Sequence, residues 1–373
     1  MIKRDIQGKV EKSLFRGKIV VIYGARQVGK TTMVKAIQKK YKESAYFNCD
    51  EPSVRRALTN KTSKELASFI GKHKLIILDE AQRVSDIGLT LKLLIDTYPE
   101  IQVLATGSSS FDLANKVIEP LTGRKYEFYL YPFSVNETMS FLSQHDWDYA
   151  LEQRLIYGMY PNVMINDVEK ETIVREIARS YVFKDILTFD KIRNSEALEK
   201  LLQALALQIG SEVSYNELAD TVGINKDTVR DYIRILEQSF IIFRLRPFRR
   251  NVRTELRKLR KIYFYDLGIR NALINNLNPL NLRTDKGALW ENFLITERLK
   301  YLSNNNLDRQ TFFWRTQQRE EIDYVESYAD ELEAYEFKWK DKKKVIAPKK
   351  WRDNYPNAKF QLITSKNYQK FLK

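Results

Sequence analysis

Short apolar runs alternate with helix-like stretches along the first third of the chain. The runs are mostly continuous in apolar residues instead of alternating with polar ones, at 18–23, 45–48, 75–78 and 102–106. Continuous runs of this length are typical of strands buried on both faces of a parallel sheet. Helix-like segments at 32–40 and 64–70 lie between them. The pattern predicts an α/β fold with a parallel sheet covered by helices.

A glycine-rich loop connects the first apolar run to the first helix-like segment. It reads G-x-x-x-x-G-K-T and consists of Gly24, Ala25, Arg26, Gln27, Val28, Gly29, Lys30 and Thr31, with Thr32 next. Backbone N–H groups of such a loop surround phosphate oxygens, and the helix N-terminus adds partial positive charge there. Lys30 would reach the β- and γ-phosphates, and the Thr31 hydroxyl would ligate Mg²⁺. Strand, loop and helix in this order favour an ATP site over a chance glycine-rich turn.

Two carboxylates, Asp79 and Glu80, follow the apolar run at 75–78. In open α/β sheets ligands bind at the carboxyl ends of the strands, where these side chains emerge. Asp79 would hold Mg²⁺ through its water shell, and Glu80 would orient and deprotonate the attacking water. A strand that ends in two solvated acids is the alternative, and the loop upstream makes it a minor one.

Two further polar residues are candidates for contact with the γ-phosphate. Ser108, in the serine-rich turn after the run at 102–106, would contact the γ-phosphate or the water. Arg124, after Gly123, would stabilise the transferring phosphoryl group within one chain or from a neighbouring subunit of a homo-oligomer. A common serine turn and an ordinary surface arginine are the alternatives. The strand that ends at Asp79 and the strand at 102–106 fit the P-loop arrangement in which an extra strand lies between the glycine-rich loop's strand and the carboxylate strand.

Beyond residue 134 the pattern changes twice. Residues 135–195 read as a mostly helical lid or connector. Residues 196–268 contain a short helix capped by Ser214, a turn at Gly223 and a second helix from Lys226, which is a helix-turn-helix signature. Strand-like runs near 241–245 and 261–265 would form the wing of a winged helix.

The basic residues favour an anionic partner. The chain of 373 residues carries a formal charge of +15. A cluster of basic residues lies between the two wing strands: Arg246, Arg249, Arg250, Arg253, Arg257, Lys258, Arg260 and Lys261. Such a run can neutralise several DNA phosphates. A solvated loop, on a helix-turn-helix that binds a protein partner, is the alternative.

The last part, residues 269–373, carries a nuclease-like set of charged residues. In an extended strand Glu336 and Lys338 point to the same face, where Asp323 on a partner strand would meet them. The acids would hold one or two Mg²⁺ ions, with Glu291 adding a ligand from a helix, and Lys338 would position the attacking water. A solvated strand face is the alternative.

The motifs together resemble a prokaryotic AAA-type P-loop ATPase family whose members carry a C-terminal domain of unknown function. They are 24–31, 78–80, 105–110, 123–124 and 132–134, and, for the C-terminal domain, 265–268, 290–292, 322–324 and 336–338. The resemblance implies an AAA/ASCE-type ATPase core over 1–134, a winged helix, and a restriction-endonuclease-like α/β domain of the PD-(D/E)XK type. Ile322 stands where the name of that motif has proline.

The cysteine content and the length of the apolar runs add to the expected function. One cysteine, Cys49, rules out an intramolecular disulfide, and no apolar run approaches the length of a membrane helix. We therefore expect a cytoplasmic ATPase that binds DNA, with a metal-dependent nuclease domain. The alternative is a nucleotide-dependent switch that binds a protein and keeps the nuclease-like domain as an inactive scaffold.

Overall fold

The computed structural model separates the chain into two compact units. It describes residues 2–107, 121–180, 192, 194–248, 260–340 and 345–372. The first unit is Met1–Phe133 with Gln238–Phe240, and the second is Ser134–Glu237 with Ile241–Lys373. The units divide one residue before the expected boundary at 134, and the expected boundaries at 195 and 268 lie inside the second unit.

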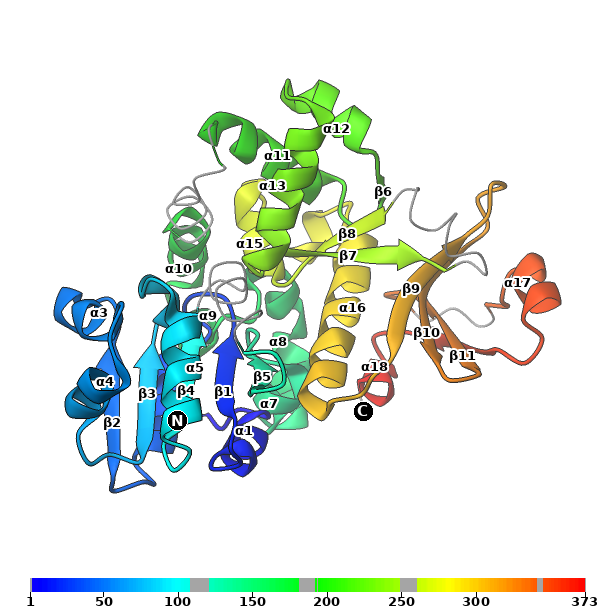
Figure 1. Cartoon of the computed structure of the whole chain (residues 1–373). Helices are drawn as coiled ribbons and strands as arrows, with labels where there is room; N and C mark the ends of the chain where they lie inside the picture. The colour runs from blue at the N-terminus through cyan, green and yellow to red at the C-terminus, as the bar shows by residue number, and fades with distance from the viewer. Residues whose placement is uncertain are drawn as a thin grey trace. The chain divides into compact units, whose positions relative to one another are not determined.

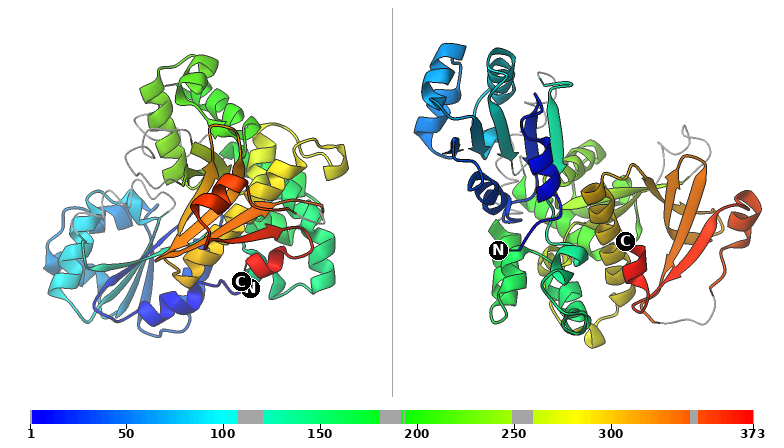
Figure 2. Two further views of the ribbon diagram at one scale, coloured as in Figure 1. Left: turned by 90° about the vertical axis from the view of Figure 1, so that its right-hand side faces the viewer. Right: turned by 90° about the horizontal axis from the view of Figure 1, so that it is seen from below.

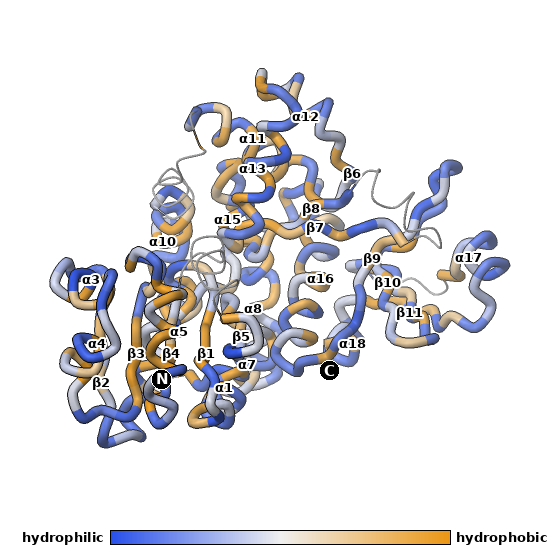
Figure 3. Tube along the Cα trace, viewed as in Figure 1, coloured by the Kyte–Doolittle hydropathy of each residue, from blue (hydrophilic) through white to orange (hydrophobic). Residues whose placement is uncertain are grey.

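A five-stranded sheet forms the centre of the first unit (Figure 1). All its strand pairs are parallel, in the order β2-β3-β4-β1-β5. The strands are β1 (Ile19–Tyr23), β2 (Ser44–Asn48), β3 (Leu75–Asp79), β4 (Gln102–Gly107) and β5 (Lys125–Tyr129). Every residue of β1, β3 and β4 is buried, which explains their continuous apolar runs (Figure 3). Because β4 pairs with both β1 and β3, the expected extra strand between the two motif strands is confirmed.

Helices α2 and α5 pack against this sheet. The helices of the unit are α1 (Gln7–Ser13), α2 (Lys30–Gln38), α3 (Pro52–Leu58), α4 (Ser63–Ile70) and α5 (Ile87–Thr97), with a 3₁₀ turn η1 (Ala81–Arg83). Helix α2 begins at Lys30, two residues before the expected start, so the loop lysine itself lies in the first turn. Helix α4 begins with a capping box between Thr62 and Glu65.

The second unit combines helices with one mixed sheet of seven strands. Its helices are α7 (Val135–Met139), α8 (Gln144–Tyr157), α9 (Pro161–Ile165), α10 (Lys170–Ile177), α11 (Ser195–Leu207), α12 (Tyr215–Val222), α13 (Lys226–Gln238), α15 (Leu267–Leu273), α16 (Lys286–Asn305), α17 (Lys349–Asn354) and α18 (Tyr368–Phe371), with a 3₁₀ turn η4 (Leu280–Leu282). Within residues 135–180 the described elements are helices, as expected for this stretch. Among the described residues, no helix combines the length and apolar character needed to cross a membrane.

The sheet of the second unit joins two segments that the sequence pattern separates. Its order is β12-β11-β10-β9-β7-β8-β6. The strands are β6 (Glu212–Val213), β7 (Ile242–Pro247), β8 (Arg260–Phe264), β9 (Gln310–Arg315), β10 (Glu321–Tyr328), β11 (Glu331–Phe337) and β12 (Lys359–Ile363). Strands β9 to β12, orange to red in Figure 2, lie side by side, and β9 pairs with β7 through Arg246 and Pro247. The expected boundary at 268 therefore cuts one sheet.

The helix-turn-helix elements form as the sequence indicates. The Ser214 hydroxyl accepts a hydrogen bond from the Glu217 N–H at the start of α12, and Gly223 ends the helix with φ +77°. Helix α13 follows, and then the antiparallel pair β7–β8. This order of elements is the one that a winged helix requires; the winged-helix assignment itself stays a prediction.

The segment 265–268 holds helices together. Asp266 caps α15 by accepting the Ile269 N–H, and it also accepts the Met159 N–H beyond the end of α8. At Gly268 a Cβ atom would lie 2.1 Å from the Tyr157 carbonyl oxygen, so α15 approaches α8 closely enough to require glycine. These residues of the family motif therefore have a packing role.

Replacement of Gly268 by alanine is expected to destabilise the second unit. The added Cβ would overlap backbone, so the free energy of unfolding should fall by roughly 1–3 kcal/mol, measured by urea unfolding. Gly287 is the matched control, because it is also helical and a Cβ there meets no atom within 4 Å. Gly287→Ala should be neutral or stabilising by up to about 1 kcal/mol. Equal midpoints for the two variants would contradict the packing argument.

Candidate functional site

The glycine-rich loop lies between the end of β1 and the start of α2, at the carboxyl edge of the sheet. At Gly24 a Cβ atom would lie 2.2 Å from the Leu130 carbonyl oxygen, so any side chain would force the loop away from the chain after β5. Gly29 precedes α2 with φ +96°, a left-handed conformation that favours glycine. The two glycines of the motif therefore set the shape of the loop.

The Lys30 ammonium group lies inside this loop. Its side chain is buried, and Nζ donates to the carbonyl oxygens of Gly24 and Ala25, each at 2.8 Å. A buried positive charge at a helix N-terminus favours a bound anion. The phosphate-binding role of this lysine stays a prediction.

Asp79 is the centre of a hydrogen-bond network at the end of β3. Its Oδ2 accepts from the Thr31 hydroxyl at 2.7 Å and from the Tyr46 hydroxyl at 2.6 Å, and its Oδ1 accepts from the Thr106 hydroxyl. The structure therefore brings together Thr31 and Asp79, the expected Mg²⁺-binding pair. A hydroxyl and a carboxylate are oxygen ligands of the kind that Mg²⁺ prefers, so the residues fit this ion.

Thr106 and Tyr46 belong to this network and were not expected there. Thr106 ends the apolar part of β4, and its Oγ1 also accepts the Glu80 N–H at 3.2 Å. Tyr46 lies on β2, two residues before Asn48, which is the register partner of Asp79. The signal that could have found both residues is their position near the carboxyl ends of the strands beside β3. Ser108, the residue favoured for this edge, lies outside the described residues.

Glu80 has a left-handed backbone conformation. Its φ is +54°, in the left-handed region that few residues other than glycine adopt. The Glu80 carboxylate accepts a hydrogen bond from the Gln82 side chain at 2.5 Å. Glu80 is thus held beside Asp79 at the edge where the loop lies.

Arg124 lies at the amino ends of the strands, opposite the end where the glycine-rich loop lies. Its carbonyl oxygen accepts the Ile19 N–H at the amino end of β1, and its side chain pairs with the exposed Asp96 at 2.9 Å. The strand length, roughly 13 Å, separates this end from the loop. Arg124 therefore does not reach the phosphate loop of its own chain, and a role from a neighbouring subunit stays a prediction.

Arg4 is a contact of the loop that the sequence pattern did not reveal. Its buried guanidinium donates to the Val28 carbonyl at 2.5 Å and to the Tyr131 carbonyl at 2.6 Å. It also lies over the ring of Phe133, 4.7 Å from the centroid. The amino-terminal segment thus ties the loop to the chain that follows β5.

A second charged cluster lies in the other unit. Asp323 on β10 accepts the Phe337 N–H at 2.7 Å, and Lys338, just after β11, pairs with Glu336 at 2.7 Å. Glu291 on α16 is close enough to act on the charge of both Asp323 and Lys338. The four residues expected to form a nuclease-like set are therefore gathered in one region.

Two residues of β8, Lys261 and Tyr263, also belong to this cluster. Lys261 Nζ lies 3.0 Å from Glu291 Oε1 and also contacts Glu321. The Tyr263 hydroxyl donates to the same Glu291 oxygen at 2.6 Å. Lys261 is part of the basic run expected to bind DNA, but its side chain is 2% exposed, so that expectation is wrong for this residue. The position of Lys261 in this cluster follows from the pairing of β8 with β7 in the sheet.

Burial, followed by the negative charges of Glu291 and Glu336, raises the pKa of Asp323 well above its usual range. Although burial alone would lower the pKa of Lys261, the carboxylates of Glu291, Glu321 and Asp323 raise it above its usual value. The surroundings therefore favour the protonated form of both groups.

The expected metal site at this cluster is not formed. Among the described residues, no three acidic, histidine or cysteine side chains are grouped so that they could hold one metal ion. The reason is visible in the contacts, because Lys261 takes up Glu291 and Lys338 takes up Glu336. As they stand, these side chains do not fit a divalent ion, in contrast to Thr31 and Asp79.

The basic residues of the helix-turn-helix segment are only in part described. Residues 249–259, which hold most of the expected DNA-binding run, lie outside the described residues. On α13, Lys226, Arg230 and Arg234 are exposed, and Arg230 pairs with Asp227 at 3.1 Å. The exposed face of α13 thus carries both positive and negative side chains.

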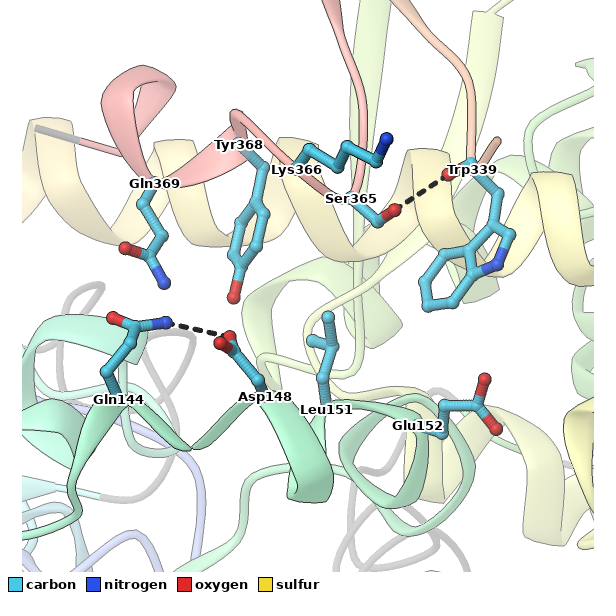
Figure 4. A pocket seen from close by; sticks show the side chains of 9 residues that line it. All are labelled: Gln144, Asp148, Leu151, Glu152, Trp339, Ser365, Lys366, Tyr368 and Gln369. Carbon is cyan, nitrogen blue, oxygen red and sulfur yellow. Dashed lines mark hydrogen bonds between the residues drawn. The ribbon is translucent and has the colours of Figure 1, made fainter. Parts of the chain in front are cut away.

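The second unit also contains a cavity of about 430 Å³ (Figure 4). Gln144, Asp148, Leu151 and Glu152 line it from α8, and Trp339, Ser365, Lys366, Tyr368 and Gln369 line it from the carboxyl-terminal part. No residue expected to act at either site lines this cavity.

The strand order, the glycine-rich loop and the Asp79 network define the first unit as P-loop ATPase-like. In agreement, a family model described as an AAA domain matches residues 16–139. Two models described as domains of unknown function, DUF8612 and DUF4143, match residues 148–280 and 286–371. The chain thus resembles AAA-type ATPases that carry a C-terminal DUF4143 region.

Two relatives with similar sequences are uncharacterized proteins. One from Mycobacterium tuberculosis is 27% identical over 329 residues, which is 87% of this chain and 71% of the relative. One from Methanocaldococcus jannaschii is 24% identical over 351 residues, which is 87% of this chain and 75% of the relative. A Walker-type ATPase of Pyrococcus abyssi has a similar structure, with a TM-score of 0.52 and 15% identity over 73% of this chain and 96% of that one. This likeness shows the fold of a P-loop ATPase.

Replacement of Thr106 by valine tests the Asp79 network. Valine keeps the shape but removes the donor to Asp79 and the acceptor for Glu80, so the first unit should lose about 1–3 kcal/mol of stability. Misplacement of both carboxylates should also lower ATP turnover roughly 10²-fold.

Thr90→Val is the matched control for this variant. Thr90 is buried on α5, and its hydroxyl donates to the Leu58 carbonyl at 2.9 Å instead of to Asp79. The control should lose comparable stability and keep its turnover. If both variants lose turnover alike, Thr106 acts only through general stability.

Proposed function

We propose that the chain binds ATP at the glycine-rich loop and hydrolyses it with the help of Asp79 and Glu80. One observation carries the proposal: the Asp79 carboxylate accepts the Thr31 hydroxyl at 2.7 Å, next to the loop that encloses the Lys30 ammonium group. The AAA-domain match and the Walker-type neighbour support an ATPase-like function. Hydrolysis and the roles of single residues are our inference.

In this proposal each residue has a separate task. Lys30 exchanges the carbonyl oxygens of Gly24 and Ala25 for the β- and γ-phosphates when the nucleotide enters. Thr31 and Asp79 would hold Mg²⁺, which when bound neutralises charge on the phosphates. Glu80 orients the attacking water and accepts its proton, as a carboxylate at this position can.

Glu80→Gln should separate binding from hydrolysis. The amide can still accept a hydrogen bond from water but cannot take its proton, so turnover should fall about 10²-fold or more while ATP affinity stays. ATP binding by fluorescence titration and phosphate release by a coupled assay measure the two. The exposed Glu100 provides the matched control, Glu100→Gln, which should leave both unchanged. Unchanged phosphate release in Glu80→Gln would remove Glu80 from the mechanism.

We further propose that the chain binds DNA through the helix-turn-helix segment. Three observations support this: the charge of +15, the order of elements from α12 to β8, and the exposed Lys226, Arg230 and Arg234 on α13. The second candidate is a nucleotide-dependent switch that binds a protein partner. The Arg230–Asp227 pair and the burial of Lys261 favour that candidate, because both reduce the charge available to phosphates.

A duplex DNA titration at two salt concentrations distinguishes these candidates. Phosphate contacts release counterions, so DNA affinity should fall steeply between about 50 and 200 mM salt. Arg234→Ala should reduce the salt slope by about one. The matched control is Lys200→Ala on α11, a lysine paired with Glu196, which should keep the slope. Absence of salt-sensitive affinity would favour the protein-binding switch.

Phosphodiester cleavage is not part of the proposed function. The carboxylates of Glu291 and Glu336 are paired with lysines, and the side chains as they stand do not fit a metal ion. This favours the scaffold alternative for the nuclease-like part.

A further inference from the structure

Lys261 is a buried lysine without a role in ATP hydrolysis or in DNA binding. It lies on β8, between β7 and the short edge strand β6 of the seven-stranded sheet, with 2% of its side chain exposed. Its ammonium group contacts Glu291 and Glu321 and lies 5.5 Å from the centroid of the Phe313 ring. An isolated buried ammonium is costly, so its neighbours must compensate its charge.

Several acidic side chains surround this lysine. Glu291 comes from α16, and Glu321 and Asp323 come from β10, so three carboxylates act on Lys261 from two elements. Arg315 on β9 lies 3.7 Å from Glu321, and Lys338 is paired with Glu336 at the margin of the cluster. Lys261 is therefore the cation that the inner carboxylates share.

The contacts of Glu291 show why a metal ion would have to displace this lysine. Its Oε1 already accepts hydrogen bonds from Lys261 and from the Tyr263 hydroxyl. A carboxylate oxygen that binds Mg²⁺ directly lies about 2.0–2.1 Å from the ion, closer than either hydrogen-bond donor. The ion would also stand beside the ammonium group, and the repulsion between two cations at short range is strong in a buried site.

We propose that Lys261 is the resident cation of this cluster and that its ammonium group takes the place of a divalent metal ion. In the native chain the cluster then binds neither Mg²⁺ nor Mn²⁺. Removal of the lysine charge converts the same carboxylates into a metal site. This inference does not depend on ATP hydrolysis, which takes place in the other unit.

The test uses Mn²⁺ as the probe and the full chain without nucleotide, with Asp79→Asn throughout to weaken the loop site. Free Mn²⁺ is counted by electron paramagnetic resonance. Lys261→Met, which keeps the apolar stem and removes the charge, should bind Mn²⁺ about tenfold more tightly or better than the parent. The added substitution Glu291→Gln should abolish this gain.

Lys359→Met is the matched control. Lys359 lies on β12 of the same sheet, is 62% exposed and pairs with Glu331 and Glu333. Removal of its charge should leave Mn²⁺ binding at the parent level. An equal gain in this variant would overturn the proposal, since any lost positive charge would then suffice.

A second measurement covers the case in which Lys261→Met folds poorly. Its unfolding midpoint should rise when Mn²⁺ replaces a chelator, because the ion supplies the missing positive charge, whereas the parent should not respond. Two results overturn the proposal. One is a parent chain that binds Mn²⁺ with an affinity that Glu291→Gln abolishes. The other is a Lys261→Met variant that gains neither affinity nor stability from Mn²⁺.

Discussion

The Asp79 carboxylate organises the proposed nucleotide site. Three hydroxyl groups, from Thr31, Tyr46 and Thr106, donate to its two oxygens from three different elements around β3. Hydrogen bonds to an ionised acceptor are strong, and together they fix the orientation of the carboxylate. The Thr31 hydroxyl belongs to the first turn of α2, so the same network connects the glycine-rich loop to the sheet. The network therefore links Thr31, Asp79 and Glu80, three of the residues proposed to act in ATP hydrolysis.

The two units place carboxylates in opposite electrostatic settings. The hydroxyl groups that donate to Asp79 are neutral, so none of them compensates the charge of a carboxylate. Glu291 is instead compensated by Lys261, a cation that the chain itself supplies. The same type of side chain is therefore hydrogen-bonded by neutral groups in one unit and paired with a buried lysine in the other.

Local patterns predicted the nucleotide-binding unit well, because its strands are continuous apolar runs and its loop is contiguous in sequence. The failures concern contacts between distant segments. Arg124 is close to the motifs along the chain, but the parallel register of β5 puts it at the wrong end of the sheet. The burial of Lys261 depends on β8 lying inside a sheet continued by β9, through a pairing that no local pattern encodes. Arg4 reaches the loop from a segment without any motif.

The most direct test of the account is the effect of Mg²⁺ on ATP affinity in the native chain and in Asp79→Asn. If Asp79 and Thr31 hold the ion, Mg²⁺ should tighten ATP binding in the native chain by about tenfold or more and have little effect in the variant. Affinity that responds equally to Mg²⁺ in both proteins, or no affinity for ATP in the native chain, would contradict the account.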